Sequence, residues 1–461
     1  NLMFMMGCVM SEGMLSVREK IGYGLGDAGC NVVFQVVINY LAIFYTDVVG
    51  ISAASLATMM LCVRLIDGFT DPVMGSVADR TTSSLGKYRP YLIWLSIPYA
   101  VLFVATFLSP NLSDQGKVVY AFTTYALLML VYTGINIPYS ALGGVMTKNI
   151  TERASLQSYR MALAMAGGAV VVYTVPILVD YFGAGDDAAG YPLAIFVMAL
   201  VAIACFFLCF ISSQERVPHE PDQDAGVNIG LVFKDFLSLR HNSQLILISF
   251  FTFLILVAVV MRGTVTAYYI KYFFGREDLV NDFITWGMLA GIAGALTTSW
   301  LTKRFCKVIL LRIGMVSMIT LHLPFLLLSA GDVSFAFGLA IAANFPHMMV
   351  MALLFAMVPD TVEYGAHLLT EKANKMALAF SGHLLALKFG IAAGGSLALG
   401  CLAYFGYVAN AEQTERALNG IMLTYVAGPV VCGFVVLMLL PRYVLSNAKM
   451  HEIGGALKNV I

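Results

Sequence analysis

Apolar blocks long enough to cross a lipid bilayer recur along almost the whole of this 461-residue chain. Crossing as a helix takes roughly 20 apolar residues, and about twelve blocks meet this length with few charges inside them. They lie at 20–46, 52–78, 90–109, 117–146, 156–182, 191–213, 243–270, 283–303, 307–330, 333–359, 376–405 and 420–441. Charged residues make up 12% of the chain, about half their usual share in soluble domains. The sequence therefore predicts an all-α membrane protein with about twelve transmembrane helices.

Lysine and arginine are divided unevenly between the two sides that these helices would separate. Of the 27 Lys and Arg residues, nineteen fall at the chain ends or in the even-numbered gaps, and four fall in the odd-numbered gaps. Those four are Lys117, Lys271, Arg276 and Arg416. By the positive-inside rule, this asymmetry predicts that both termini are cytoplasmic.

The longest polar stretch, SQERVPHEPDQDAGVNIG at 213–230, separates six predicted helices from six more. Short basic loops, DRTTSSLGKYRP and TKRFCKVILLR, occupy equivalent places in the two halves. Weak internal symmetry of this kind is typical of transporters built from two six-helix repeats. The predicted parts are an N-terminal segment at 1–19, helical halves at 20–213 and 243–441, a cytoplasmic linker at 214–242 and a cytoplasmic tail at 442–461. Within the first segment, residues 1–13 are interpreted as non-native or disordered.

Motifs that would indicate an enzyme are absent from the sequence. It contains no HExxH, GxSxG, P-loop, haem or CxxC pattern, and its eight cysteines are scattered through apolar segments. An even helix count with cytoplasmic termini also argues against a seven-helix receptor. We expect a protein that is not an enzyme, has no cofactor, and has neither nucleic acid nor an obligate protein as partner.

Charged residues interrupt several of the predicted spans, where a charge costs ~2.5–3.5 kcal/mol on insertion scales. They include Arg64, Asp67, Asp71, Arg160, Arg262 and Lys388. Asp67 and Asp71 lie four residues apart on one helix face and repel each other unless a positive charge is near. One interpretation is an Arg64–Asp67 packing pair with Asp71 at a helix end before Pro72. The other is a small cation or proton site, and a hydroxyl such as that of Thr133 would favour a metal ion.

Seven motifs in register give the chain a family resemblance from Lys20 to its last helix. They are KIGYGLGDAGCN, FYTDVVG, RLIDGFTDPVMG, GKYRPYLIW, YTGINIPYSAL, YYIKYFFG and PDTVEYG. The chain resembles the glycoside–pentoside–hexuronide:cation symporters, which include melibiose permease and belong to the major facilitator superfamily. The resemblance implies cation-coupled sugar symport by alternating access, in a bacterial inner membrane.

The resemblance also implies a coupling-ion site on the second and fourth helices. Its ligands fall on Asp67, Thr70, Asp71 and Thr133 of this chain. Na⁺ is the expected ion, bound by Asp67, Asp71 and Thr133, with H⁺ or Li⁺ as alternatives. Melibiose permease has Asn at the position of Thr70, and this departure leaves the choice of cation open.

The sugar site implied by the resemblance differs more from that of melibiose permease. Two carboxylates that grip the galactosyl group there are replaced by Asn31 and Asn136, and its aromatic platforms are replaced by Ser140 and Met351. These departures argue against an ordinary galactoside as substrate.

Three cations, Arg160, Arg262 and Lys388, would make the expected substrate cavity net positive. Arginine binds carboxylates in a bidentate way that a neutral sugar does not require. We therefore expect an acidic sugar, such as a glucuronide or a uronate oligosaccharide. In the alternative, Arg262 and Lys388 pair with backbone carbonyls or with Asp27, and the substrate is a xyloside or another neutral oligosaccharide.

A few further residues carry weaker expectations. Asp360 and Glu363 are predicted to form an inner gate of salt bridges with two basic loops, the one between the second and third predicted helices and the one between the fourth and fifth. In the alternative, these two residues lie at a solvated helix end. The remaining rival functions are a uniporter and a sodium-coupled lipid carrier of the same fold. Packing roles are expected for His322, His347 and His383, which lie on apolar helices.

Overall fold

The computed structural model describes residues 14–217, 236–369, 375–408 and 412–458. Residues 1–13, predicted to be non-native or disordered, lie outside this range. Every predicted apolar block has a helical counterpart in the described part of the chain. Ten of the described helices are long and apolar enough to cross a membrane. The block at 90–109 forms two shorter helices that meet at Leu95.

The chain divides into two compact units, of which unit 1 is Asn1–Leu237 with Lys372–Ser381 and unit 2 is Ser238–Glu371 with Gly382–Ile461. The helices of unit 1 are α2 (Val17–Ile43), η1 (Phe44–Val48), α3 (Ala53–Arg80), α4 (Pro90–Trp94), α5 (Ser96–Thr106), α6 (Asp114–Val145), α7 (Ile150–Gly183) and α8 (Asp187–Ser212). Those of unit 2 are η2 (Leu239–His241), α10 (Ser243–Tyr268), η3 (Tyr269–Phe273), η4 (Glu277–Leu279), α11 (Val280–Leu301), α12 (Lys307–His322), η5 (Leu323–Leu327), α13 (Val333–Leu369), α15 (Glu415–Leu439), η6 (Leu440–Arg442) and α16 (Asn447–Lys458).

Helix α14 (Met376–Tyr404) begins in unit 1 and continues into unit 2. Its first turn is held by Asp79 of α3, whose two carboxylate oxygens accept hydrogen bonds from the backbone N–H groups of Ala377 (3.0 Å) and Leu378 (2.8 Å). A carboxylate satisfies the free N–H groups at a helix N-terminus and complements the helix dipole. This contact explains why the start of α14 groups with unit 1, a feature that the sequence did not predict.

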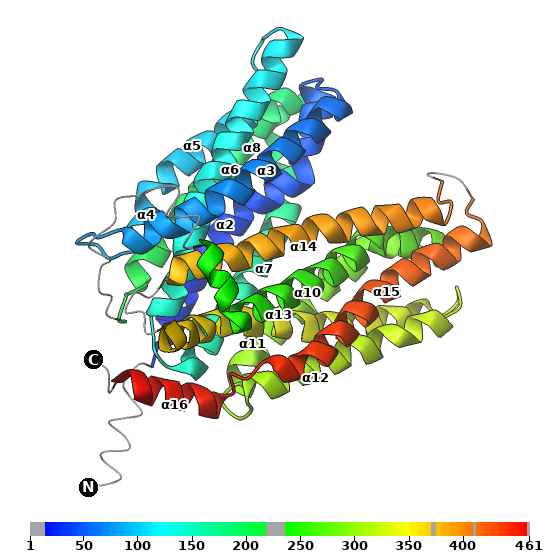
Figure 1. Cartoon of the computed structure of the whole chain (residues 1–461). Helices are drawn as coiled ribbons and strands as arrows, with labels where there is room; N and C mark the ends of the chain where they lie inside the picture. The colour runs from blue at the N-terminus through cyan, green and yellow to red at the C-terminus, as the bar shows by residue number, and fades with distance from the viewer. Residues whose placement is uncertain (1–13, 218–235, 370–374, 409–411, 459–461) are drawn as a thin grey trace. The chain divides into compact units, whose positions relative to one another are not determined.

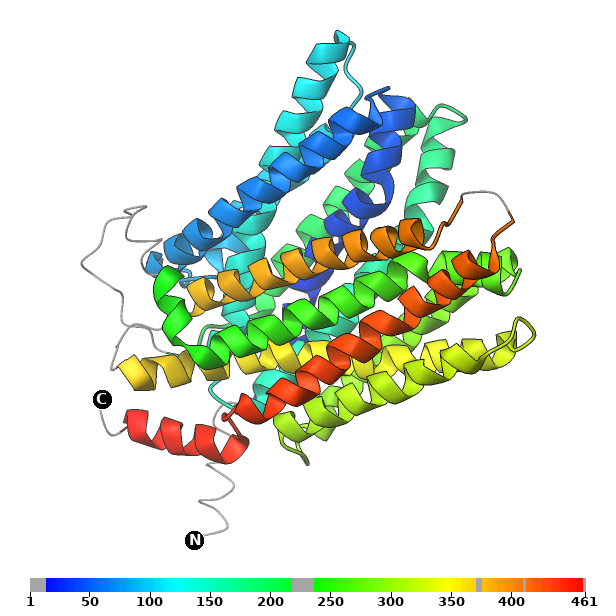
Figure 2. The same ribbon diagram turned by 45° about the vertical axis from the view of Figure 1, so that its right-hand side comes forward.

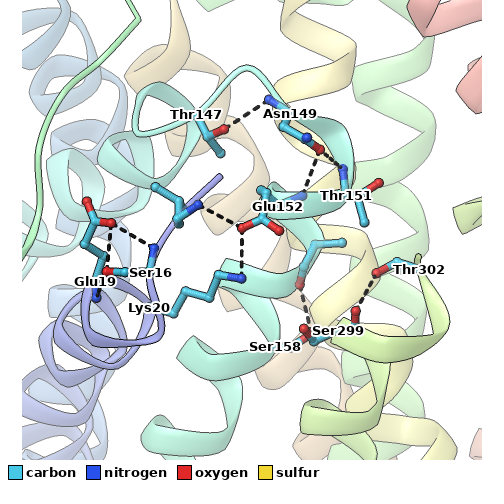
Figure 3. A network of polar contacts seen from close by, with 12 residues as sticks. Ser16, Glu19, Lys20, Thr147, Asn149, Thr151, Glu152, Ser158, Ser299 and Thr302 are labelled. Atoms are coloured by element: carbon cyan, nitrogen blue, oxygen red, sulfur yellow. Dashed lines mark hydrogen bonds and ion pairs between the residues drawn. The ribbon is translucent and has the colours of Figure 1, made fainter. Parts of the chain in front are cut away.

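In unit 1, α2 packs along both α7 and α8, and α3 packs against α6 (Figure 1). The close approach of α2 and α7 requires Gly167, because a Cβ there would lie 3.0 Å from the carbonyl oxygen of Ala28. An ion pair ties the first turns of the same two helices together: Lys20 Nζ lies 2.8 Å from Glu152 Oε2, and both side chains are buried (Figure 3). The side chain of Asn149 caps α7 directly beside this pair.

In unit 2, α10 packs against α15, and α11 packs against α13 (Figure 2). Gly294 of α11 faces the backbone of α13 so closely that a Cβ there would overlap the carbonyl oxygen of Phe345. Such close helix approach over small residues is a common way for membrane helices to pack.

We expect Gly294→Ala to lower the stability of unit 2, because overpacking a close contact costs about 1–3 kcal/mol. Gly338→Ala on α13 is the matched control, since a Cβ at Gly338 meets no heavy atom within 4 Å. Thermal unfolding of the purified variants, followed by circular dichroism, measures the difference. Equal unfolding temperatures for the two variants would contradict the close contact.

Candidate cation and substrate site

The predicted cation site is built on the contact between α3 and α6. Asp71 is fully buried on α3, and its Oδ1 accepts a hydrogen bond of 3.0 Å from the hydroxyl of Thr133 on α6. Thr133 is itself 2% exposed. The structure thus brings together two of the four predicted ligands, from helices that are 62 residues apart at this point.

The remaining ligands of the predicted cation site lie along α3. Thr70 is half-buried beside Asp71. The side chains of Arg64 and Asp67 lie outside the described residues, and only their place on α3 is given. Helix α3 passes through Pro72 and ends at Arg80. The interpretation that Asp71 sits at a helix end before Pro72 is therefore wrong.

The donor set of this site suits a small hard cation. Carboxylate and hydroxyl oxygens are the ligands that such cations prefer. A metal ion bound there would offset the repulsion expected between two carboxylates that lie one helical turn apart. Asp71 and Thr133 fit this chemistry, because the buried carboxylate already has a hydroxyl oxygen at hydrogen-bonding distance.

Arg160 of α7 forms a buried ion pair with Asp27 of α2, with Nε 2.8 Å from Oδ2. Its guanidinium also donates to Ser140 Oγ at 3.2 Å and stacks over the ring of Tyr139. Asn31, one turn after Asp27, donates its amide to the Asp27 carbonyl at 3.1 Å. The structure therefore groups the predicted residues Asn31 and Arg160 around a carboxylate.

Asp27 changes the predicted electrostatics of the site. The prediction that Arg160 is an uncompensated positive charge is wrong, because Asp27 neutralises it. Sequence reasoning considered Asp27 only as a partner for Arg262 or Lys388. A signal was present, since Asp27 is an acidic residue in the middle of an apolar helix of 27 residues, but the signal does not identify a partner on another helix.

Helix α6 connects the cation residues to the predicted substrate residues. Thr133, Asn136 and Ser140 follow one another at helical spacings of three and four, which places them on one face. All three are buried. Thr133 contacts Asp71 and Ser140 contacts Arg160. One stripe of α6 therefore touches both groups of residues.

The other two predicted cations belong to unit 2. Arg262 of α10 is 8% exposed and donates to Asn344 Oδ1 of α13 at 2.7 Å. Within the described part of unit 2, its partner is thus a side-chain amide and not a backbone carbonyl, which was one form of the alternative. Lys388 lies half-buried on α14.

The two predicted gate residues lie near the end of α13. Lys307, at the start of α12, places its Nζ 2.6 Å from Asp360 Oδ2 and 3.1 Å from the carbonyl oxygen of Ala356. Both charged side chains are buried. This ion pair lies within unit 2 and joins the first residue of α12 to α13. The inner gate formed with the two basic loops stays a prediction. Glu363 is half-buried one turn further along α13.

Comparisons with known proteins find relatives along nearly the whole chain. Residues 22–447 match the family of MFS/sugar transport proteins. A putative glycoside/cation symporter of Escherichia coli, YagG, is 35% identical over 96% of this chain and 95% of its own length. The isoprimeverose transporter of Lactiplantibacillus pentosus is 32% identical over 92% and 88%, and a glucuronide carrier protein homolog of Escherichia coli is 29% identical over 96% and 96%.

Solved structures give the same fold. The fucose:proton symporter FucP of Escherichia coli superimposes with a TM-score of 0.62, covering 93% of this chain and 98% of the other at 12% identity. A bacterial homologue of the iron transporter ferroportin gives a TM-score of 0.64, covering 92% and 98% at 14% identity. The chain therefore belongs to the MFS/sugar transport family of the major facilitator superfamily, within the glycoside–pentoside–hexuronide:cation symporter group.

Proposed function

We propose that this protein is a Na⁺-coupled symporter of an acidic sugar that works by alternating access. Asp67, Thr70, Asp71 and Thr133 hold the cation. Asn31, Asn136, Arg160, Arg262 and Lys388 contact the sugar. The observation that carries the proposal is the buried hydrogen bond between the Thr133 hydroxyl and Asp71, because it joins a carboxylate and a hydroxyl oxygen inside a transporter fold.

Coupling follows from the shared face of α6. A cation bound at Asp71 and Thr133 fixes the contact between α3 and α6. The same face of α6 carries Asn136, which is buried, and Ser140, which is bonded to Arg160. Sugar affinity should therefore rise when the cation is bound, and by linkage the cation should bind more tightly when the sugar is present.

The charges support an acidic substrate. Because Asp27 compensates Arg160, the positive charge that we assign to substrate binding is that of Arg262 in unit 2, whose described partner is the neutral amide of Asn344. Relatives of this chain are named for the transport of a glycoside, isoprimeverose and a glucuronide, so the candidate substrates include neutral and acidic sugars. A glucuronide or a uronate oligosaccharide suits a site with buried arginine better than a neutral sugar does.

We also propose that the transporter lies in a bacterial inner membrane with both termini in the cytoplasm. The distribution of Lys and Arg supports this orientation. Function requires the sugar, the cation and the lipid bilayer, and no obligate protein partner.

Uptake into right-side-out vesicles tests the proposal. A panel of a glucuronide, a uronate oligosaccharide, a xyloside and melibiose is measured with and without an inward Na⁺ gradient at fixed pH. We expect Na⁺ to stimulate uptake of an acidic member of the panel. Uptake that ignores Na⁺ but follows a pH gradient would make H⁺ the coupling ion. Uptake that is indifferent to both gradients would refute symport.

A further inference from the structure

Unit 2 contains a cluster of basic side chains that the proposed cation coupling does not use. Arg262 lies on α10, His322 ends α12, and His347 lies on α13 three residues after Asn344. These groups are 8%, 1% and 4% exposed for Arg262, His322 and His347. His347 lies one helical turn after Asn344, the hydrogen-bond partner of Arg262, and the ring of His322 lies 6.1 Å from that of Tyr425 on α15. Helix α10 packs against both α13 and α15, so the three groups come from adjacent helices.

The two histidines carry hydrogen-bonding atoms that the described residues leave unused. His322 Nδ1 lies 2.7 Å from the carbonyl oxygen of Met318. A carbonyl only accepts, so Nδ1 carries the proton, and Nε2 of the neutral ring is an acceptor. This buried Nε2, like Nδ1 of His347, meets no hydrogen-bond partner in the described part of the chain. Buried polar atoms of this kind are costly unless a ligand or a water satisfies them.

Arg262 has a matching excess of donors. Its guanidinium offers five N–H groups, and among the described residues its hydrogen-bond partner is the neutral Asn344. Among the described residues, no carboxylate forms an ion pair or hydrogen bond with Arg262. This environment contrasts with that of Arg160, which has a carboxylate 2.8 Å away. A buried guanidinium without an acidic partner is suited to an oxyanion supplied from outside the chain.

We propose that Arg262, His322 and His347 form a subsite for a hydroxy acid, in which the oxyanion accepts from Arg262 and a neighbouring hydroxyl donates to His322 Nε2. The inference rests on the proposed sugar symport and assigns the binding of the substrate's carboxylate to unit 2. A uronic acid satisfies both demands with one ring, since its carboxylate neighbours the hydroxyl on C4. A neutral glycoside would leave the charge of Arg262 uncompensated, and an acid without the hydroxyl would leave Nε2 unused.

The test compares a glucuronide with the glucoside of the same aglycone and with the 4-deoxyglucuronide. We expect Arg262→Gln to lower kcat/KM for the glucuronide by ~10-fold or more, the loss of a charged hydrogen bond, and to leave the glucoside within about twofold. Arg416→Gln is the control, because Arg416 is an exposed arginine of the same unit. The glucoside in each variant reports whether the protein has folded.

Two His322 variants test the hydroxyl contact. His322→Asn keeps a donor near Nδ1 and removes the acceptor at Nε2, whereas His322→Gln can place an amide oxygen near the position of Nε2. We expect the asparagine variant to take up the glucuronide at the rate at which wild type takes up the 4-deoxy compound. We expect the glutamine variant to take up the glucuronide faster than the asparagine variant does. A packing role alone would lower glucuronide and glucoside equally, which would overturn the proposal.

The outcomes separate this subsite from the proposed function. Cation-driven glucuronide uptake whose ratio to glucoside uptake is unchanged in Arg262→Gln and His322→Asn would refute the subsite and leave symport intact. If wild type transports the glucoside but no glucuronide, both the acidic substrate and the subsite are wrong. If no sugar is transported, symport fails, and the subsite is decided by glucuronate protection of the purified protein against thermal unfolding. A rise in the unfolding temperature of the wild type with glucuronate, lost in Arg262→Gln, supports the subsite. An unchanged unfolding temperature of the wild type overturns it.

Discussion

Asp71→Asn is expected to abolish cation-driven uptake, and Thr133→Val is expected to raise the cation concentration for half-maximal uptake by about 10–100-fold. The asparagine side chain keeps the shape of Asp71 but removes the charge that attracts the cation. Valine removes the hydroxyl that lies 3.0 Å from Asp71 Oδ1, and a hydrogen bond to a charged group contributes about 1.5–3 kcal/mol. The measurement is initial uptake of the substrate found with the panel, over a range of external Na⁺ concentrations.

Thr124→Val is the matched control for the Thr133 variant. Thr124 is also buried on α6, but its hydroxyl donates to carbonyl oxygens of its own helix, those of Tyr120 and Ala121, and none of its described partners is a carboxylate. Its replacement should leave the cation dependence unchanged. If both threonine variants shift the Na⁺ curve alike, the effect belongs to α6 as a helix and not to a cation site. Full gradient-driven uptake by Asp71→Asn would remove Asp71 from the coupling mechanism.

Asp27→Asn is expected to lower the free energy of unfolding by about 3–5 kcal/mol, because it leaves Arg160 buried without its carboxylate. The two side chains are 8% and 3% exposed and their charged atoms lie 2.8 Å apart. Arg160→Gln should have a similar cost, since it strands the carboxylate. A loss of this size is a large part of the 5–15 kcal/mol that stabilises a typical domain.

The double variant Asp27→Asn/Arg160→Gln completes the test, because two neutral amides can bond to each other in place of the ions. We expect it to be more stable than either single variant, giving a coupling energy of the kind seen for residues in direct contact. Thermal unfolding of purified wild type, the two single variants and the double variant measures the four stabilities of this double-mutant cycle. Arg276→Gln/Asp278→Asn is the control, since that pair is 48% and 61% exposed and its removal should leave stability unchanged. Additive losses at Asp27 and Arg160 would show that the buried pair contributes no coupling.

The buried pair also bears on the substrate. Neutralising Arg160 within unit 1 leaves the recognition of acid to unit 2, where Arg262 is bonded to the amide of Asn344. In the proposed function, unit 1 contributes the cation site and, through Asn31 and Asn136, neutral hydrogen-bonding groups. Cation coupling and acid selectivity would thus be changed by separate substitutions, which the two sets of variants can measure.

Hydropathy alone predicted each transmembrane helix, because a bilayer offers no partner for unpaired backbone groups and so requires a helix wherever an apolar block crosses. The pair of carboxylates in the proposed cation site was also predictable from local sequence, because a spacing of four residues places Asp67 and Asp71 on one face of any helix. The same local pattern misled at Pro72, because proline can remain inside a membrane helix when neighbouring groups compensate for it, and α3 continues to Arg80.

The sequence did not predict which polar residues from distant parts of the chain contact each other. Asp27 meets Arg160 from 133 residues away, Lys307 meets Asp360 from 53 residues away, and Asp79 reaches the first turn of α14. Packing roles were predicted for His322 and His347, and the structure adds that each has a buried ring nitrogen without a hydrogen-bond partner among the described residues. The sequence by itself determined which segments cross the membrane and which charges needed an explanation, since both follow from the cost of burying polar groups in lipid. Only the tertiary structure decided which charges compensate each other, because that depends on how each helix is rotated about its axis and on the depth at which it packs.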